Sequence, residues 1–560
     1  MRRPTVDGWS ADLATISRDI GSLLAMESAL MGFSVLVALL FGEWYPAAGF
    51  LLAGVITASV GLSARLRFED APAPQMKHGM IIAAAGWFSV AVFGSIPLIL
   101  AAHLTPPSVM ATYVPADVDT TGWEAIAVGS TTTVSSLAYF QNPLHALFES
   151  MSGWTGSGLT MAIHEPSLPR SMQWWRSLIQ YVGGVGVIVL TVSILARPGS
   201  GSYALYRSEA REERIHPSVI STVRTVWKIL LLYTGVSILL LFVAIWASDY
   251  GKTLPLWEVG WQALNHAMTG LTTGGFSVTD NSIATYDSPL IETALLPIMT
   301  LGAIAFTVHY GVLWNDEVDL LYEDLQTRWL FVLLAIGITV LSVQNFVATP
   351  TEADAFVGDW FGLAALFGER HVVVFRDSLF QWVSALTCTG FQSAPINRWS
   401  SGGKLIVSVA MTLGGAAGST VGGIKIIRGY TISRGIRWQF ARVFLPANAV
   451  VNLDIGDRHL DREEMEREFS EAAIISLLWI FLLIASSIVL VNLAGPEYGY
   501  ADALFEIASA QGNVGLSSGI TGPSMHPFAE AMFLFNMWIG RLEIIPVLAF
   551  IRSILYGLDP

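Results

Sequence analysis

The chain has 560 residues, of which 53% are apolar and only 13% carry a charged side chain, and its formal net charge is −14. Soluble domains carry roughly 25% charged residues, so this composition excludes an ordinary cytosolic enzyme and a disordered chain. The single cysteine excludes an intramolecular disulfide and a thiolate metal cluster, and the acidic balance argues against a nucleic-acid partner. The composition therefore predicts a polytopic integral membrane protein, and apolar stretches of helix length predict that it is all-α.

Ten stretches of the sequence are apolar and long enough to cross a bilayer, whose core needs about 20 residues per helix. They are 23–43, 47–65, 79–103, 175–197, 228–248, 290–314, 328–348, 404–427, 471–494 and 531–555. Arg2, Arg3 and Arg18 precede a first span of full length, which favours a retained helix over a cleaved signal peptide. Lys and Arg are about three times as frequent in loops that a cytoplasmic N-terminus places inside, so we expect both termini in the cytoplasm of a multi-pass protein of the inner or plasma membrane.

A twelve-residue motif occurs four times, each time in a loop of the expected outer face. It reads FESMSGWTGSGL (148–159), NHAMTGLTTGGF (265–276), FQWVSALTCTGF (380–391) and FEIASAQGNVGL (505–516). Position eleven is always glycine, namely Gly158, Gly275, Gly390 and Gly515. These glycines are separated by roughly 120 residues each time, and such self-similarity indicates a repeated unit.

Each motif follows an apolar stretch of about ten residues, which is too short to cross a bilayer. A segment that enters the membrane and returns must line a water-filled cavity or be buried in protein, so four re-entrant segments predict one pseudo-fourfold pore. Backbone carbonyls can replace the water around a weakly hydrated monovalent cation, and turning them inward needs φ values that glycine adopts without strain. The alternative, that each glycine only ends a loop helix, explains one loop better than four ungapped matches. The candidate filter residues are Thr155, Gly156, Ser157, Gly158, Thr273, Gly274, Gly275, Cys388, Thr389, Gly390, Asn513, Val514 and Gly515.

These motifs and the helices after them resemble the Trk/Ktr/HKT superfamily of potassium transporters, most closely its Trk-type pore subunit. The second-helix segments that carry the resemblance are WWRSLIQYVGGVGVIVL (174–190), IETALLPIMTLGAIAFTVHY (291–310), GGAAGSTVGGIKIIRG (414–429) and WIGRLEIIPVL (538–548). The resemblance implies that the four glycines form the filter, and that glycine rather than serine at Gly158 selects potassium. The first filter departs from the usual Thr-rich sequence, with Gly156 where the second has Thr273.

The resemblance also implies potassium as the transported ion, a homodimer, and a separate cytoplasmic nucleotide-binding regulatory subunit. This chain has no nucleotide motif of its own, and its basic inner loops 197–228 and 425–467 offer a docking surface. The expected parts are residues 1–72 with two extra spans, 73–200, 201–315, 316–432 and 433–560, the last four being the repeats.

Five glycines interrupt the apolar stretch 414–423, and each costs about 1 kcal/mol of helix relative to alanine. One interpretation is a small-residue helix packing face, and the other is an unwound loop below the filter that acts as a gate, which the resemblance favours. Arg541 is expected mid-span in the last helix, bound to freed carbonyls of this loop or held in a structural ion pair. The candidate gate residues are Gly414, Gly415, Gly418, Ser419, Thr420, Gly422, Gly423 and Arg541.

Position two of the motif carries Glu149, His266, Gln381 and Glu506. These side chains could hold the filter through hydrogen bonds to backbone N–H groups, or add negative charge at the cation entry. The structural role, capping of the short helices, is the favoured interpretation. Cys388 is expected to be a small packing residue rather than a redox sensor, and Arg176 is expected to reach the outer interface by snorkelling.

Two other classes of protein share single features of this sequence. An intramembrane hydrolase is suggested by GLSSG (515–519), but the strand-to-helix context of a nucleophile elbow is absent and His526 falls in an outer loop. A secondary transporter for sodium or another monovalent cation, coupled to protons or sodium, would instead predict twofold, often inverted repeats. Four repeats in one orientation favour a channel-like potassium transporter that is not an enzyme.

Overall fold

The structure is a computed structural model that describes residues 5–6, 9–116, 118, 120–195, 219–348, 360–444, 453–456, 458–542 and 544–558. Its longer helices are α1 (Ala11–Leu40), α2 (Trp44–Arg67), α3 (Met76–Leu104), α5 (Pro143–Thr155), α6 (Arg170–Leu195), α8 (Val219–Ala247), α9 (Leu256–Leu271), α10 (Pro289–Ala303), α13 (Leu325–Ala348), α15 (Glu369–Leu386), α16 (Ser401–Thr412), α17 (Ile426–Ala441), α18 (Arg462–Leu493), α19 (Tyr500–Gly512), α20 (Pro527–Leu542) and α21 (Ile544–Tyr556).

The remaining elements are short. The shorter helices are α4 (Pro107–Met110), α11 (Phe306–Trp314), α12 (Leu320–Glu323), α14 (Ala364–Phe367), η1 (Ala111–Tyr113), η2 (Ser136–Gln141), η3 (Glu165–Ser167), η5 (Gly251–Thr253), η6 (Ser282–Tyr286), η7 (Ile396–Arg398) and η8 (Arg442–Phe444). Three antiparallel pairs join β1 (Thr5–Val6) to β2 (Trp9–Ser10), β3 (Ile126–Val128) to β4 (Thr131–Thr133), and β5 (Leu453–Ile455) to β6 (Arg458–Leu460). The predicted all-α class is therefore confirmed.

Each of the ten predicted spans includes helix among its described residues, but three of them are not single helices. Span 290–314 is α10 and α11, bent by 105°, and span 531–555 is α20 and α21, bent by 116°. Span 404–427 ends its helix at Thr412 and starts the next at Ile426. Among the described residues, six helices are long and apolar enough to cross a membrane, or eight if each bent pair counts as one. The number of ten crossings stays a prediction.

Each of the two bends has an identifiable structural cause. At the first, the Phe306 N–H donates to the Gly418 carbonyl at 3.1 Å, so the turn gives its hydrogen bonds to another segment. At the second, Pro546 stands at the third position of α21 and has no N–H to continue the ladder from α20. A continuous apolar run therefore conceals both breaks.

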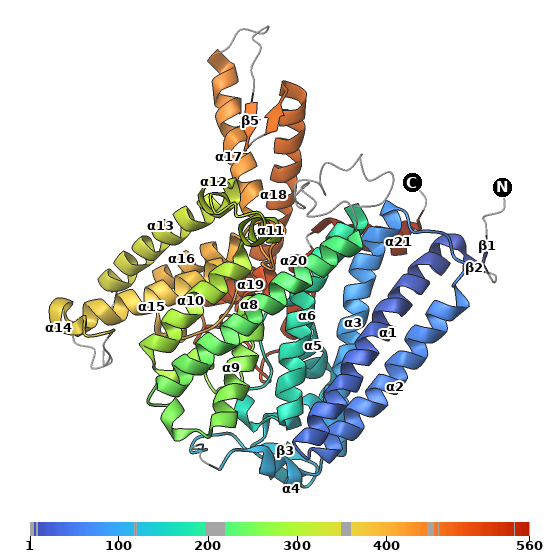
Figure 1. Ribbon diagram of the computed structural model, residues 1–560, viewed down its shortest axis with the longest axis vertical. Coiled ribbons are helices and arrows are strands. Elements are labelled where there is room, and N and C mark those ends of the chain that lie inside the picture. Colours follow the sequence, from blue (N-terminus) through green and yellow to red (C-terminus); the bar gives the residue numbers. More distant parts are fainter. Residues whose placement is uncertain are drawn as a thin grey trace.

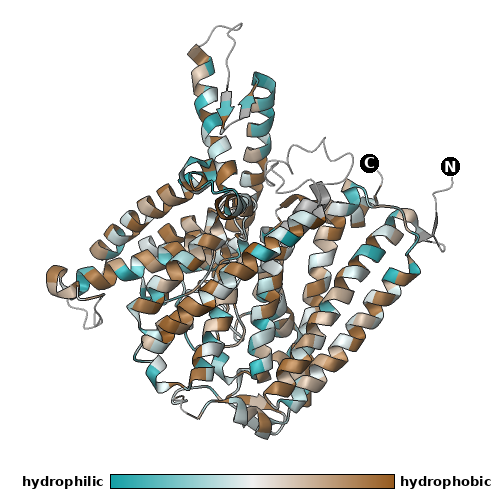
Figure 2. Cartoon of the chain, viewed as in Figure 1, coloured by the Kyte–Doolittle hydropathy of each residue, from teal (hydrophilic) through white to brown (hydrophobic). Residues whose placement is uncertain are grey.

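The first two helices form an antiparallel pair on one flank, beside α3 (Figure 1). Gly21 of α1 and Gly61 of α2 allow this pair to approach closely, because a Cβ on Gly21 would lie 2.6 Å from the Gly61 carbonyl oxygen. The outer faces of both helices carry exposed Leu, Phe and Val side chains, which Figure 2 colours brown. These faces suit a lipid environment.

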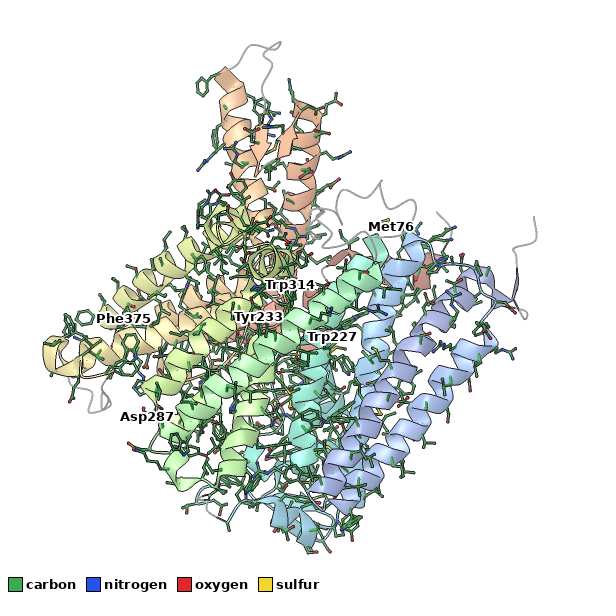
Figure 3. The ribbon with its side chains drawn as sticks, viewed as in Figure 1. Met76, Trp227, Tyr233, Asp287, Trp314 and Phe375 are labelled. Carbon is green, nitrogen blue, oxygen red and sulfur yellow. The ribbon has the colours of Figure 1, made fainter. Side chains whose placement is uncertain are left out.

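A hairpin that carries both hydrophilic and hydrophobic residues projects from one end of the molecule (Figures 1 and 2). It consists of the distal parts of α17 and α18 with β5 and β6 between them. A capping box starts α18, in which the Asp461 carboxylate accepts from the Glu464 N–H at 2.8 Å. Asp287, which follows η6, lies in the half of the molecule away from this hairpin, whereas Met76 lies toward it (Figure 3).

Candidate functional site

All four motifs end their short helices with the same turn. Position nine has a left-handed backbone in each, with φ of +71° at Gly156, +52° at Thr273, +49° at Cys388 and +55° at Asn513. The N–H of position nine donates to the carbonyl of position six at 3.0–3.3 Å, and the N–H of position ten donates to the carbonyl of position five at 2.8–2.9 Å. The first motif therefore follows the same backbone path as the others, despite its departure in sequence.

The glycines at position eleven close a ring. Their φ values are +79° at Gly158, +77° at Gly275, +80° at Gly390 and +105° at Gly515. A Cβ on each would come within 3.0 Å of the position-ten carbonyl oxygen of the next motif: Gly158 faces Gly274, Gly275 faces Thr389, Gly390 faces Val514, and Gly515 faces Ser157. Because this order returns to its start, the four segments surround one axis.

A cavity of about 610 Å³ opens onto this ring. We call it the vestibule; all four position-eleven glycines line it, together with residues just after each motif, from Thr160 to Gly522. Among its described lining residues, Glu165 and Arg398 are the acidic and basic side chains. The helices α5, α9, α15 and α19 end at position seven or eight of their motifs, just before the ring, and each helix C-terminus has a partial charge of about −0.5. The partial negative charges of these four helix ends attract a cation to the ring.

The position-two side chains contact the segments that follow each motif, and two of the four accept the predicted bonds from backbone N–H groups. Glu149 accepts from the Met161 N–H at 2.8 Å, and Glu506 accepts from the Ser518 N–H at 2.7 Å. In the other two motifs the partners are serine hydroxyls, with His266 at 2.9 Å from Ser277 and Gln381 at 3.1 Å from Ser393. Cys388 is buried within the third filter, which agrees with a packing role.

Arg176 corrects the sequence prediction, because it does not snorkel. Its side chain is only 1% exposed, and its Nε lies 2.6 Å from a Glu149 carboxylate oxygen. The guanidinium also donates to the Ser277 carbonyl at 3.0 Å and lies 4.2 Å from the centre of the Phe276 ring. Arg176 therefore ties the first short helix to the second filter. The carboxylate and hydrogen bonds offset the cost of burying its charge.

Sequence reasoning also missed residues that brace the filter from the second helices. The Gln180 amide donates to the Gly274 carbonyl at 2.6 Å and accepts from the Phe276 N–H at 3.0 Å. Three glycines of the second helices pack directly against position seven of a motif. A Cβ on any of them would clash with the position-seven carbonyl oxygen: Gly183 lies against Trp154, Gly302 against Leu271, and Gly540 against Gln511. The sequence signal that could have revealed these contacts is the glycine at a matching position of three second-helix segments.

The segment between α16 and α17 is unwound. It forms no helix from Leu413 to Lys425, and a parallel bridge pairs Leu413 with Ile424. A helical packing face is therefore wrong. All seven predicted glycine, serine and threonine gate residues lie in this segment, namely Gly414, Gly415, Gly418, Ser419, Thr420, Gly422 and Gly423.

This unwound segment connects the break of α10 to the filter. Its Ala416 N–H donates to the Ala303 carbonyl at 3.1 Å, at the end of α10. The Thr420 hydroxyl lies 3.0 Å from the Thr273 hydroxyl of the second filter. A Cβ on Gly422 would clash with the Gly512 carbonyl of the fourth motif. The segment thus packs directly against the filter.

Arg541 lies at the end of α20, just before the bend, rather than in the middle of a continuous span. Its side chain is buried and donates to the Thr420 carbonyl at 2.6 Å and to the Gly183 and Gly184 carbonyls at 3.1 and 3.0 Å. No described carboxylate lies within ion-pair distance of it. The predicted contact with a freed carbonyl of the unwound segment is therefore present, and the ion-pair alternative finds no support among the described residues.

Similarity to known proteins covers most of the chain. A family model described as "TrkH: Cation transport protein" matches residues 78–556. An uncharacterized cation transporter of Methanocaldococcus jannaschii is 30% identical over 484 residues, which are 86% of this chain and 84% of the relative. The Trk system potassium uptake protein TrkH of Halomonas elongata is 28% identical over 544 residues, 96% of this chain and 97% of the relative. The crystal structure of the potassium transporter TrkH from Vibrio parahaemolyticus matches the fold with a TM-score of 0.74 at 21% identity, over 97% of this chain and 99% of that one.

Proposed function

The chain belongs to the TrkH family of cation transport proteins, and from this premise we propose that it takes up potassium through the ring formed by the four motifs. The family consists of transporters rather than enzymes, and the relative from Halomonas elongata is a potassium uptake protein by name. The observation that carries the proposal is the closed order of the position-eleven glycines, each against a position-ten carbonyl of its neighbour.

The chemistry follows from this backbone. In every motif the backbone is left-handed at positions nine and eleven but not at position ten between them. This alternation of backbone conformation directs successive carbonyl oxygens toward one axis. Carbonyl dipoles replace the water of a potassium ion at lower cost than that of the more strongly hydrated sodium ion. The ends of the four short helices add partial negative charge, which lowers the energy of a cation held there.

The unwound segment 413–425 is the proposed gate. It packs under the second and fourth filters through Thr420 and Gly422, and Arg541 holds it by the Thr420 carbonyl. A positive charge below the filter repels a passing cation, so Arg541 and the segment together obstruct the cytoplasmic side. Uptake requires this segment to move.

Reversal potentials in liposomes test the potassium proposal. With potassium on one side and sodium on the other, we expect the reversal potential to follow the potassium gradient and to ignore imposed proton or sodium gradients. A potential that shifts with either coupling gradient would instead support the secondary transporter. Equal permeability to potassium and sodium would contradict the filter.

The assembly is a further part of the proposal. We expect a homodimer in the cell membrane, with cytoplasmic termini and a nucleotide-binding regulatory subunit on the cytoplasmic face. The projecting hairpin offers a surface, because Arg437 is exposed and Arg442 and Arg462 share Glu466 at 3.3 and 3.2 Å. Residues 197–218 of the other predicted docking loop, with Arg197, Arg207, Arg211 and Arg214, lie outside the described residues, as do Arg2 and Arg3.

Light scattering and co-purification test this assembly. The purified transporter is expected to have twice the mass of one chain, and Arg437→Glu is expected to weaken co-purification of a Trk-type regulatory subunit at least about tenfold, since charge reversal turns attraction into repulsion. Arg398→Glu, on the vestibule side, is the matched control. A monomer, or equal capture by both variants, would contradict the assembly.

A further inference from the structure

Glu165 is an unusual acid at the rim of the filter. It begins η3, between the first filter and α6, and it lines the vestibule. The residue is only 8% exposed, yet its carboxyl oxygens accept no hydrogen bond or ion pair from any other residue that the structure describes. By contrast, the neighbouring acids have partners: Glu149 pairs with Arg176 at 2.6 Å, and Asp280 with His164 at 3.0 Å.

The charges around Glu165 come from four elements. Arg176 on α6 attracts its carboxylate, while Asp280 after the second filter and Glu149 on α5 repel it. Arg398, in η7, is the other charged residue of the vestibule lining. Because Arg176 is already neutralised by Glu149 and its carbonyl contacts, Glu165 is left as an acid that can attract a mobile cation.

We propose that Glu165 forms an outer binding site for a monovalent cation in the vestibule, and that a proton competes with the cation there. This inference rests on the proposed function, since it takes the vestibule as the path to the filter. A carboxylate in a partly enclosed aqueous cavity raises the local cation concentration, because low-dielectric walls focus its field. A protonated carboxyl has no such effect.

The direction of the pH dependence follows from burial. Burial raises the pKa of Glu165 to about 8, against the opposing attraction of Arg176. Above this pH the carboxyl is ionised and attracts cations, and as the external pH falls through it the attraction is lost. External acid should therefore slow uptake when potassium is scarce, and should have little effect when potassium saturates the site.

The test measures potassium currents of the full chain in liposomes at external pH 6.5 to 9.5. At low external potassium, we expect the wild-type current to rise at least about threefold between pH 7 and 9. Glu165→Gln should remove this rise and keep the low-pH current at every pH. Added impermeant salt should shrink the wild-type rise, because salt screens a charge in an aqueous cavity.

The control is Glu124→Gln, which removes an exposed acid from the same outer region and should leave the pH response intact. Should Glu165→Gln fail to fold, Glu165→Asp keeps a carboxyl and should keep a pH-dependent rise. A flat wild-type profile, or a rise that survives in Glu165→Gln and so belongs to another group such as His164, would overturn the inference. The reversal potential in the same recordings reports the filter separately, so loss of potassium selectivity in the wild type would count against the proposed function instead.

Discussion

Gly158→Ser is expected to lower the potassium-to-sodium permeability ratio at least about tenfold, which corresponds to about 1.4 kcal/mol of lost discrimination. Gly158 has a φ of +79°, and a Cβ there would clash with the Gly274 carbonyl oxygen. Both conditions force the backbone to shift, because side chains disfavour the left-handed region and the neighbouring carbonyl cannot give way without leaving the ring. The widened ring should admit sodium. Reversal potentials under bi-ionic conditions measure the ratio directly.

The matched control for this prediction is Gly32→Ser. Gly32 lies on α1, has an ordinary helical backbone and has nothing within 4 Å of the position of a Cβ. The Gly32→Ser variant should leave the permeability ratio unchanged and should alter stability only by the small difference in helix propensity between glycine and serine. Because the ring is closed by four equivalent contacts, Gly275→Ser, Gly390→Ser and Gly515→Ser should lower the ratio as well. Unchanged ratios in all four variants would show that these glycines do not form the filter.

The sequence predicts the four matching segments of the ring because their signal is local and repeated. Glycine at position eleven marks the place where a side chain cannot fit, and the four copies support one another. The turn at position nine was less visible, because Thr273 and Cys388 adopt a left-handed backbone that is uncommon for their residue types, whereas Asn513 is of a type that adopts it more readily. The surrounding structure fixes that turn through the position-five and position-six carbonyls.

The features that the sequence conceals depend on distant contacts. The burial of Arg176 follows from its pairing with Glu149 and from the Ser277 carbonyl, and neither partner can be read from the position of Arg176 in its span. The bend between α10 and α11 likewise follows from hydrogen bonds with the unwound segment, more than 100 residues later in the chain. Hydropathy describes each stretch alone, so it reports a continuous span in that place.

Arg541→Ala is expected to raise potassium flux at least about fivefold while leaving the permeability ratio unchanged. The substitution leaves the Thr420, Gly183 and Gly184 carbonyls without their charged donor. Hydrogen bonds to charged groups contribute roughly 1.5–3 kcal/mol each, so their loss should destabilise the closed position of the unwound segment. Removal of the positive charge also lowers the barrier to a cation below the filter. Single-channel recordings or flux assays in liposomes separate open probability from conductance.

Arg541→Lys should restore only part of the wild-type behaviour, because a single ammonium cannot reproduce a fork of donors that reaches two segments at once. Arg65→Ala removes one exposed charge at the end of α2 and serves as the control for net charge. Thr420→Val keeps the shape of the segment but removes hydroxyl contacts to Thr273 and to the Gly302 carbonyl, at 3.0 and 2.9 Å. It should raise open probability without changing the charge below the filter, which distinguishes release of the gate from loss of repulsion. If Arg541→Ala folds normally and both it and Thr420→Val conduct as the wild type does, the segment is a fixed support of the filter and not its gate.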